Sequence, residues 1–598
     1  MARSDQYFAH SDNVAQSGKE PLATHLSRVS KLAAEYAAAA GGQELARVTG
    51  LLHDLGKYGD LFQQRLRQEV RRVDHSTPGA LAALRYKAAG IAPALAIQGH
   101  HGGLRVASPE ALRSLMESGQ AEVSAEGRRL SEPDLGLLLT RLRHDGLELP
   151  ATDNLSAPDP SPLTAPSVAA MLDVRMLFSA LVDADFVATE AHFTGHQRPA
   201  GPPLKPEQAL SSLRAHLETL PTGSPASPGV LSLRADLLEA CLNAADRSPG
   251  LFTLTAPTGA GKTLSMLAFA LLHAVKHDLR RIVVVIPYLS IIEQTVRVYR
   301  EALASWCGAD SQLYVLEDHS LAGTQAKPDQ QAGDDDPEDE AQKLRDMLSE
   351  NWDAPLVVTT SVQFLESLFA HRPAPCRKLH RLAQSVILFD EVQTIPENLV
   401  VPTLAALGRL AERYGSSVVF STATQPAFRR LDQQVRRFSS CGWEPTEIAP
   451  EGLQLFERAR RITVRWPQKD TSPLPWEQLA QELAACPQVL CVVNLKRHAA
   501  KLLDRLTAVE TAGLFHLSTS MCPAHRQNVL ARVANRPEGE PCRLISTQCV
   551  EAGVDVDFPV VYRAWGPLEA LAQAAGRCNR NGNAERGEVR VFFPESEP

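Results

Sequence analysis

The chain has 598 residues, of which 44% are hydrophobic and 22% charged, a composition typical of a globular protein with a sizeable core. At about 150 residues per domain, this length predicts roughly three to five domains. The net charge of −8 excludes a uniformly basic nucleic-acid coat but leaves local basic patches possible.

Neither a membrane span nor a secretory signal is predicted. No apolar run approaches the roughly 20 residues that cross a bilayer, and residues 1–13 contain no apolar signal core. The ten cysteines form no CxxC pair, and the first of them is Cys241. We therefore expect no disulfide framework and no zinc ribbon, and we predict a cytoplasmic location without membrane contact.

The predicted elements change character along the chain. Residues 1–200 carry apolar positions at i, i+3 and i+4, which predicts an all-α domain, and the Pro-rich segment 201–230 is expected to be a linker. Short β-rich apolar runs then alternate with helical segments over 231–461 and again over 462–598. This alternation is typical of parallel sheets covered by helices on both faces. The predicted architecture is one all-α domain followed by two α/β domains.

Histidines and carboxylates of the helical domain form a candidate metal site. The candidate ligands are His25, His53, Asp54, His75, His100, His101 and Asp185. Asp185 lies in a strongly apolar helix, where an unpaired carboxylate would be costly. Imidazole and carboxylate ligands together suit Mn, Fe, Co or Ni. The set is large enough for two ions bridged by Asp54, and a metal pair about 4 Å apart can hydrolyse a phosphodiester.

Other polar residues of this domain leave alternatives open. Asp183 competes with Asp185 for the ligand role. Lys57, one turn after His53, is equally well explained as a solvated lysine and as a catalytic group beside the scissile phosphate. The four remaining histidines of the domain receive no ligand role: His10, His144, His192 and His196.

The segment TAPTGAGKT (Thr255–Thr263) lies between a predicted strand and a predicted helix and has the features of a phosphate-binding loop. Lys262 would reach the β and γ phosphates of ATP, and the Thr263 hydroxyl would hold Mg²⁺. The first glycine of the usual pattern is replaced by Ala256. The predicted nucleotide-binding residues are Thr258, Gly259, Ala260, Gly261, Lys262 and Thr263.

Further motifs follow at the ends of predicted strands. Asp390 and Glu391 end SVILFDE, where Asp390 can bind the magnesium ion and Glu391 can polarise the attacking water. STAT (421–424) and STQCVEAGVD (546–555) come next, and Asp555 is assigned to the nucleotide site. Arg577 and Arg580 are three residues apart and can stabilise the charge of phosphoryl transfer as catalytic arginines, although such a pair is usually only solvated.

Nucleic-acid binding stays possible through local contacts, which would be made mainly to phosphates. The candidate DNA-binding residues are Thr359, Thr360 and Thr547. Candidate basic patches are Arg429, Arg430, Arg436 and Arg437, and Arg458, Arg460 and Arg461, although any single one is more simply a solvated arginine.

The order of these motifs carries a resemblance. HLSRV, LLHDLGKY, DHSTPGA, GHHGG and DADF precede TAPTGAGKT, FDEVQ, STAT, STQCVEAGVD and AAGRCNRNG. The α/β half resembles superfamily 2 helicases, and the helical half resembles the HD superfamily of metal-dependent phosphohydrolases. Their fusion resembles the CRISPR-associated nuclease–helicases of type I systems, most closely those of subtype I-C.

This resemblance implies two RecA-like domains with ATP in the cleft between them. It implies an ATP-dependent 3′ to 5′ helicase and a metal-dependent nuclease acting on single-stranded DNA, recruited by the Cascade complex and its guide RNA once a target R-loop forms. For the metals it implies one ion held by His25, His53, Asp54 and Asp185, and another held by Asp54, His75, His100 and His101.

Some features depart from the family pattern. Gln393 stands where DExH helicases carry the histidine that couples the two motor domains, and Arg234 is only a weak candidate for reading the adenine base. The sequence ends 18 residues after Arg580, so we expect either that the family's accessory C-terminal domain is absent or that the sequence is a fragment.

Two alternative functions remain open from the sequence. One is an HD nucleotide or cyclic-dinucleotide phosphohydrolase with a regulatory helicase-like ATPase. The other is an inert DNA-binding component of a larger effector, against which the intact Lys262 and the complete ligand set both argue.

Overall fold

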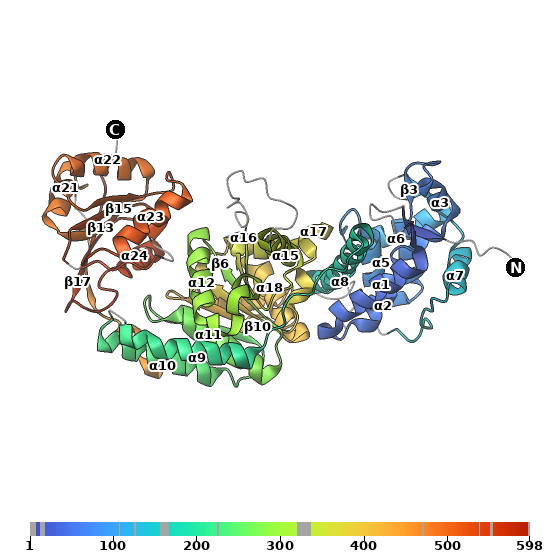
Figure 1. Ribbon diagram of the computed structural model, residues 1–598, viewed down its shortest axis with the longest axis horizontal. Coiled ribbons are helices and arrows are strands. Elements are labelled where there is room, and N and C mark those ends of the chain that lie inside the picture. Colours follow the sequence, from blue (N-terminus) through green and yellow to red (C-terminus); the bar gives the residue numbers. More distant parts are fainter. Residues whose placement is uncertain are drawn as a thin grey trace.

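The computed structural model describes residues 7–11, 18–106, 108–124, 127–155, 167–223, 226–319, 337–468, 472–537, 539–550 and 554–595. Three bodies follow one another in Figure 1: a helical domain at the N-terminal end, a first α/β domain in the middle and a second α/β domain at the C-terminal end. Among the described residues, no helix combines the length and the apolarity that crossing a membrane requires.

The helical domain is built around the pairing of α1 with α2 and of α1 with α8. Leu22, Leu26, Val29 and Ala33 form one buried stripe of α1 because they recur at helical spacing. The helices are α1 (Leu22–Tyr36), α2 (Gln43–Leu52), α3 (Asp60–Leu66), α4 (Ser76–Leu84), α5 (Ile91–Gly99), α6 (Pro109–Ala121), α7 (Leu135–His144) and α8 (Ser167–Thr194). Two small sheets join them, β1 (Phe8–His10) with β2 (Glu20–Pro21) and β3 (Val73–Asp74) with β4 (Arg129–Leu130).

The first α/β domain has a seven-stranded parallel sheet in the order β11-β5-β10-β9-β6-β8-β7. Its strands are β5 (Leu251–Thr255), β6 (Arg281–Ile286), β7 (Val315–Asp318), β8 (Leu356–Thr360), β9 (Ser385–Asp390), β10 (Ser417–Thr422) and β11 (Thr446–Glu447). Its helices are α9 (Pro206–Gly223), α10 (Pro228–Ala244), α11 (Lys262–His277), α12 (Leu289–Ala302), α13 (Ala304–Cys307), α14 (Ser311–Tyr314), α15 (Pro337–Asn351), α16 (Ser361–Phe369), α17 (Pro373–Cys376), α18 (Glu397–Tyr414), α19 (Asp432–Val435) and α20 (Leu455–Arg458).

The second α/β domain has a six-stranded parallel sheet in the order β12-β17-β16-β13-β15-β14. Its strands are β12 (Ile462–Arg465), β13 (Gln488–Val492), β14 (Leu514–Leu517), β15 (Cys542–Ser546), β16 (Val560–Ala564) and β17 (Gly587–Phe592). Its helices are α21 (Trp476–Ala485), α22 (Lys496–Thr507), α23 (Pro523–Ala534) and α24 (Leu568–Ala575). The predicted fold class, an all-α domain followed by two parallel α/β domains, is confirmed.

The segment expected to be a linker is mostly helical. Within 201–230, α9 places Ala209, Leu210 and Leu213 in the core of the first α/β domain, where they pack with Leu233 and Leu237 of α10. These apolar positions recur at helical spacing, so burying them against the sheet layer is more favourable than exposing them as a linker.

Candidate metal centre and nucleotide cleft

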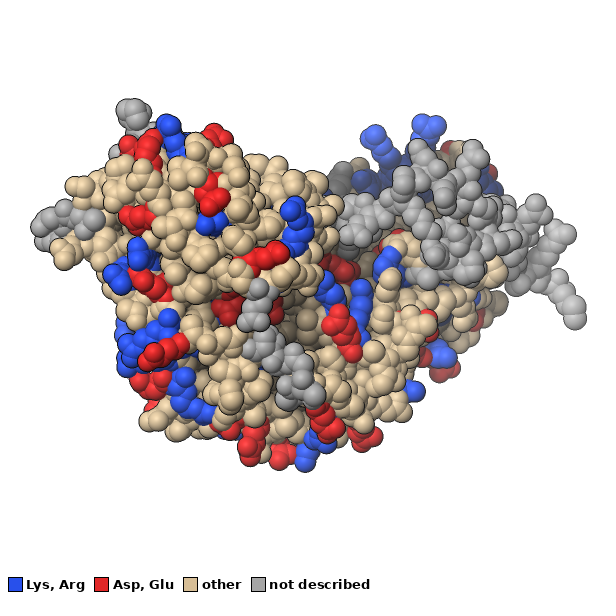
Figure 2. All heavy atoms as spheres, turned by 60° about the vertical axis from the view of Figure 1, so that its left-hand side comes forward, with Lys and Arg blue, Asp and Glu red and all other residues tan. Residues whose placement is uncertain are grey.

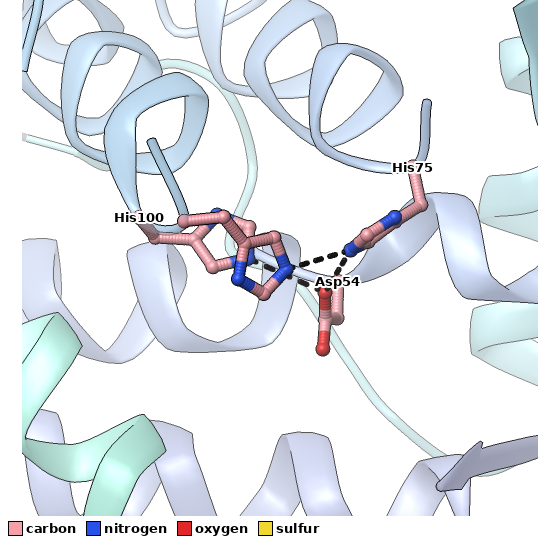
Figure 3. A group of neighbouring side chains, drawn as sticks. Asp54, His75 and His100 are labelled. Carbon is pink, nitrogen blue, oxygen red and sulfur yellow. Dashed lines mark hydrogen bonds and ion pairs between the residues drawn. The ribbon is translucent and has the colours of Figure 1, made fainter. Parts of the chain in front are cut away.

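The seven predicted metal ligands converge from separate elements of the helical domain. His25 lies on α1, His53 at the end of α2, His75 at the start of α4 and His100 at the end of α5. Asp54 precedes the short 3₁₀ helix η2 (Leu55–Tyr58), His101 follows His100, and Asp185 lies on α8. Figure 3 shows Asp54, His75 and His100 pointing toward one another. Their sequence separation is large, so only the packing of these helices brings them together.

One group of ligands surrounds Oδ2 of Asp54. His25 Nε2 lies 3.5 Å from this oxygen and 3.4 Å from Asp185 Oδ1. His53 Nε2 lies 3.2 Å from Asp54 Oδ2 and 3.3 Å from His25 Nε2. Four donor atoms from three helices and the turn after α2 therefore face one point.

A second group surrounds the other oxygen of the same carboxylate. Asp54 Oδ1 lies 3.5 Å from His75 Nε2 and 3.5 Å from His100 Nε2. His101 Nε2 completes this group at 2.8 Å from His75 Nε2. Because each oxygen of Asp54 belongs to a different group, this carboxylate is placed to bridge two ions.

The donor atoms fit divalent transition metals. With metal–ligand bonds of about 2.1 Å, neighbouring ligand atoms lie about 3.0–3.4 Å apart, close to the separations seen here. Asp54 Oδ1 and His100 Nε2 are buried and have no hydrogen-bond partner among the described residues, a costly state unless a cation satisfies them. The Nδ1 atoms of His53 and His100 face the carbonyl oxygens of Gly50 and Ile97 at 2.8 and 2.6 Å, which leaves Nε2 directed inward.

Electrostatics differ between the two groups. Burial acts to lower the pKa of His25, but hydrogen bonds to Asp185, Asp54 and Glu20 outweigh it and raise that pKa to about 10. Burial also acts to lower the pKa of His53. The charge of Asp54 and hydrogen bonds to Asp185 and Asp54 outweigh it and raise that pKa to about 9. A metal ion would displace these protons, so binding in this group weakens as pH falls.

Two imidazoles of the second group, those of His75 and His101, have lowered pKa values that favour the neutral form. Burial lowers the pKa of His75 well below its ordinary value. The neighbouring His100 and, after it, burial lower the pKa of His101 to about 3. Neutral rings offer a free lone pair, which is the form of histidine that binds metals.

The structure distinguishes between the alternatives that the sequence left open for two residues, Lys57 and Asp183. Lys57 is 4% exposed, and its Nζ lies 2.6 Å from Asp54 Oδ2, so it is a buried group of the metal centre rather than a solvated lysine. Asp183 faces away from the histidines and pairs with Arg377 of the first α/β domain at 2.8 Å. Asp185 is therefore the carboxylate of α8 that reaches the ligand set.

Glu20 is a site residue that the sequence pattern did not predict. Its carboxylate forms a third group with His25 and His10, a histidine for which the sequence predicted no ligand role. Glu20 belongs to β2, which pairs with β1, and a two-residue strand leaves almost no periodic signal.

The candidate phosphate-binding loop joins β5 to α11, the strand and the helix that the sequence predicts on either side of it. Gly259 and Gly261 have φ values of 82° and 85°, a left-handed conformation that favours glycine and turns the loop around the N-terminus of α11. Lys262 Nζ donates to the carbonyl of Ala256 at 2.9 Å and so lies folded over the loop.

Asp390 is the last residue of β9 and Glu391 follows it, on the same edge of the sheet as this loop. Burial and, after it, the charge of Glu391 raise the pKa of Asp390 to about 6. Gln393 donates from Nε2 to Glu391 Oε2 at 2.8 Å and accepts from Thr422 Oγ1 at 2.7 Å. The glutamine thus links the DEVQ segment directly to STAT.

The second α/β domain lies against the phosphate-binding loop. Gly576 lies so close to Thr258 that a Cβ atom added to this glycine would be 2.3 Å from Thr258 Oγ1. Gly259 lies similarly close to two arginines, since a Cβ atom added to it would be 3.0 Å from Arg461 Nη2 and 3.5 Å from Arg580 Cγ. Arg580 also pairs with Asp555 at 3.0 Å. The nucleotide residues of both domains therefore meet at one cleft.

The other arginines near this cleft have distinct surroundings. Arg577 is 5% exposed, and its Nε donates to the carbonyl of Val550 at 2.9 Å, so it lies within its own domain. Arg234 of α10 donates to the carbonyl of Gly259 at 3.1 Å and thereby contacts the loop backbone. Of the predicted pair, Arg580 is the arginine at the phosphate-binding loop.

The predicted DNA contacts are only partly accessible. Thr359 is fully buried in β8, so its side chain lies inside the domain. Thr360 accepts a hydrogen bond from the backbone N–H of Gln363 at 2.9 Å and caps α16, and Thr547 follows β15 with 4% exposure. In the predicted basic patches, Arg436 pairs with Asp432 and Glu444, which leaves less charge for DNA.

Three family models match the chain in sequence order. Residues 22–135 match the HD domain, residues 238–431 match the DEAD/DEAH box helicase, and residues 486–583 match the C-terminal part of the CRISPR-associated nuclease/helicase Cas3. The matches support a Cas3-like HD-helicase. Such domains imply the use of ATP with magnesium and of a divalent metal.

Two curated relatives carry the same description. The chain is 26% identical over 437 residues to the CRISPR-associated nuclease/helicase Cas3 of Haloferax volcanii, covering 58% of this chain and 46% of the relative. It is 23% identical over 356 residues to that of Methanothermobacter thermautotrophicus, covering 56% and 39%. The chain thus spans less than half of the length of these curated relatives.

Solved structures share the fold over almost the whole chain. The structure of T. fusca Cas3 with AMPPNP gives a TM-score of 0.66 at 19% identity, covering 99% of this chain and 75% of that one. A chain of a CRISPR RNA-guided surveillance complex in a pre-nicking state gives 0.60 at 17% identity, covering 99% and 74%. At these identities the likeness concerns the fold alone.

Proposed function

We propose that this chain couples an ATP-driven translocase on single-stranded DNA to a metal-dependent DNA nuclease. The observation that carries the proposal is the convergence of six further candidate ligands around the two oxygens of Asp54, in the same chain as a candidate phosphate-binding loop. A metal centre with a bridging carboxylate suits the hydrolysis of phosphodiesters.

In the nuclease, His25, His53, Asp54 and Asp185 would hold one ion, and Asp54, His75, His100 and His101 the other. Mn, Fe, Co or Ni bound there would supply Lewis-acid activation of water and of the scissile phosphate. Lys57 places an ammonium group beside Asp54 in a buried setting and can donate a hydrogen bond to a phosphate oxygen at the centre. His101 is the exposed ligand, so it lies at the entrance for a strand.

In the motor, Lys262 and Thr263 would bind the phosphates and the magnesium ion of ATP, with Asp390 as a further magnesium ligand. Glu391 orients the attacking water, and Gln393 holds Glu391 toward Thr422. Arg580 approaches from the second α/β domain, so it reaches the transferred phosphoryl group only when the cleft is closed.

DNA would cross both α/β domains and feed the metal centre in the 3′ to 5′ direction of translocation. Figure 2 shows a face on which basic and acidic side chains are interspersed and which is hollowed near its middle. Such a surface favours recognition through individual phosphate contacts, with Thr360 as the candidate threonine that remains partly exposed, over a single large basic patch. The proposal includes recruitment by a type I surveillance complex with its guide RNA and R-loop, in a subtype I-C-like system; what supports a partnership of this kind is the fold shared with a chain of a CRISPR RNA-guided surveillance complex.

Helix α8 joins the nuclease to the motor. It lies between the helical domain and the first α/β domain (Figure 1). Asp173 pairs with Arg409 at 2.7 Å and accepts from Tyr414 at 2.8 Å, whereas Asp183 pairs with Arg377. Asp185 lies two residues after Asp183 on the same helix. Helix α8 therefore contacts both the proposed metal centre and the core of the first α/β domain.

The test combines two variants on circular single-stranded DNA and on R-loop targets, with Mn²⁺, Fe²⁺, Co²⁺ or Ni²⁺ and with or without ATP. Lys262→Ala is expected to abolish ATP hydrolysis and processive degradation but to retain metal-dependent nicking. Asp54→Ala is expected to abolish cleavage and to retain ATP hydrolysis. Matched controls are Lys276→Ala on the same helix and Asp153→Ala at an exposed position.

Three outcomes would contradict the proposal. Retained cleavage in Asp54→Ala would move the nuclease elsewhere, and unchanged R-loop degradation in Lys262→Ala would separate motor from nuclease. Hydrolysis of mononucleotides or cyclic dinucleotides with intact single-stranded DNA would establish the phosphohydrolase alternative instead.

A further inference from the structure

Glu20 lies behind the metal centre and contacts one of its ligands from the outer side. It is 4% exposed, and its Oε2 lies 3.3 Å from Nδ1 of His25, the ring nitrogen opposite the one that faces Asp54 and Asp185. We propose that Glu20 is a positioning residue, whose carboxylate holds the proton of His25 on Nδ1 and so reserves Nε2 for the metal. The inference rests on the proposed metal centre.

The other inward-facing histidines show why His25 needs such a partner. A neutral imidazole carries one proton, and the nitrogen without it binds the metal. His53 and His100 place Nδ1 against backbone carbonyls. His25 has a carboxylate in the corresponding place, and a carboxylate is a stronger acceptor that also makes the imidazole a more basic ligand.

The surroundings of Glu20 keep its carboxylate in place. Pairing of β1 with β2 sets Glu20 opposite His10, and Arg28 Nη1 lies 3.3 Å from Glu20 Oε1. The same Nη1 lies 3.5 Å from the carbonyl of Ala188 on α8, so one guanidinium contacts both Glu20 and the helix that carries Asp185. Arg28 thus pairs with one oxygen of this buried carboxylate, and the other oxygen has the His25 ring at 3.3 Å as an ion-pair contact rather than a hydrogen bond.

A third cation between His10, Glu20 and His25 is the competing explanation of this cluster, because their donor atoms also lie within 4.8 Å of one another. It is disfavoured because His25 already directs Nε2 at the first group of ligands. Binding a second metal through Nδ1 would require the ring to lose both of its protons.

The experiment measures metal binding by the full-length chain. Stripped protein is titrated with Mn²⁺ by calorimetry and with Co²⁺ by visible absorption, which reports the ligands around the ion. Glu20→Gln is expected to weaken the affinity of one of two sites by about 10- to 100-fold and to alter the Co²⁺ spectrum, with two ions still bound at saturation. Glu20→Asp, which keeps the charge on a shorter side chain, is expected to give a smaller loss.

The control is Glu44→Gln, which changes an exposed carboxylate of the same domain and should bind metal like the parent. The melting temperature of each stripped variant checks folding. Parental affinity and spectrum in Glu20→Gln, if that variant folds, or an equal or larger loss in Glu20→Asp than in Glu20→Gln, would overturn the inference while leaving the metal centre intact. Three ions in the parent and two in Glu20→Gln would make Glu20 a ligand and overturn it as well. A parent that binds no metal would instead refute the proposed function.

Discussion

Replacing Arg377 by methionine tests the connection between α8 and the first α/β domain. Arg377 is 5% exposed and Asp183 is fully buried, with Nε 2.8 Å from Oδ1. Methionine retains the apolar part of the side chain but leaves a buried carboxylate supported by Asn351 at 2.9 Å. Removing one partner of a buried ion pair costs about 3–5 kcal/mol, so we expect a loss in this range.

The assay is thermal unfolding of the parent and of Arg377→Met across pH. At about 2–4 °C per kcal/mol for domains of 150–250 residues, the transition that includes α8 should fall by roughly 6–20 °C near neutral pH. Burial raises the pKa of Asp183, and Arg377 opposes this rise. Without the arginine, the folded pKa exceeds the unfolded one further, so the loss should be smallest at low pH and grow as pH rises through the folded pKa.

The control for this prediction is Arg460→Met. Arg460 is 79% exposed and pairs with Glu457 at 3.3 Å, an arrangement worth at most about 1 kcal/mol. The contrary result is that Arg377→Met shifts the unfolding temperature no more than this control and shows no dependence on pH. That result would mean that the buried pair does not stabilise the contact between α8 and the first α/β domain.

Three further predictions concern the two sites. The pKa of Asp390 is raised to about 6, so the affinity of the chain for magnesium–ATP should fall as the pH drops below that value. A fluorescent-nucleotide titration measures this affinity, and an unchanged affinity down to about pH 5 would contradict the role of Asp390 as a magnesium ligand. Arg580→Ala should lower the kcat of ATP hydrolysis by about 10³-fold or more with little change in ATP binding, whereas a change within twofold would exclude it as the catalytic arginine. Mn²⁺ at about 100 times its Kd should raise the free energy of unfolding of the parent by about 2.7 kcal/mol, and a chelator should reverse this gain. An equal gain in Asp54→Ala would show that the ion binds at another site.

Motifs whose parts are adjacent in the chain were predictable from the sequence. The loop from Thr255 to Thr263 needs only a strand, glycines that adopt positive φ and a following helix, all of which are local properties. The alternation of β-rich and helical segments likewise predicted two parallel sheets, because each buried strand must be a short apolar run. The predicted linker was mostly helix α9 instead, since its apolar positions have a partner only once the domain is folded.

Choices between neighbouring residues of one type depended on tertiary packing. Asp183 and Asp185 share an apolar helix, but residues two apart point about 200° away from each other around its axis, so each meets a different domain. The packing of α8 between those domains assigns Asp185 to the metal centre and Asp183 to Arg377.

The sequence by itself determined which chemical groups this protein carries and the order in which they occur. Ligand types, glycines and the spacing of apolar residues are all local properties of the chain. Only the tertiary structure decided which of them meet. Arg580 reaches the phosphate-binding loop while Arg577 turns into its own domain, and Glu20 comes to lie behind His25. Such encounters depend on how separate elements pack, and that information is not contained in any one segment of the chain.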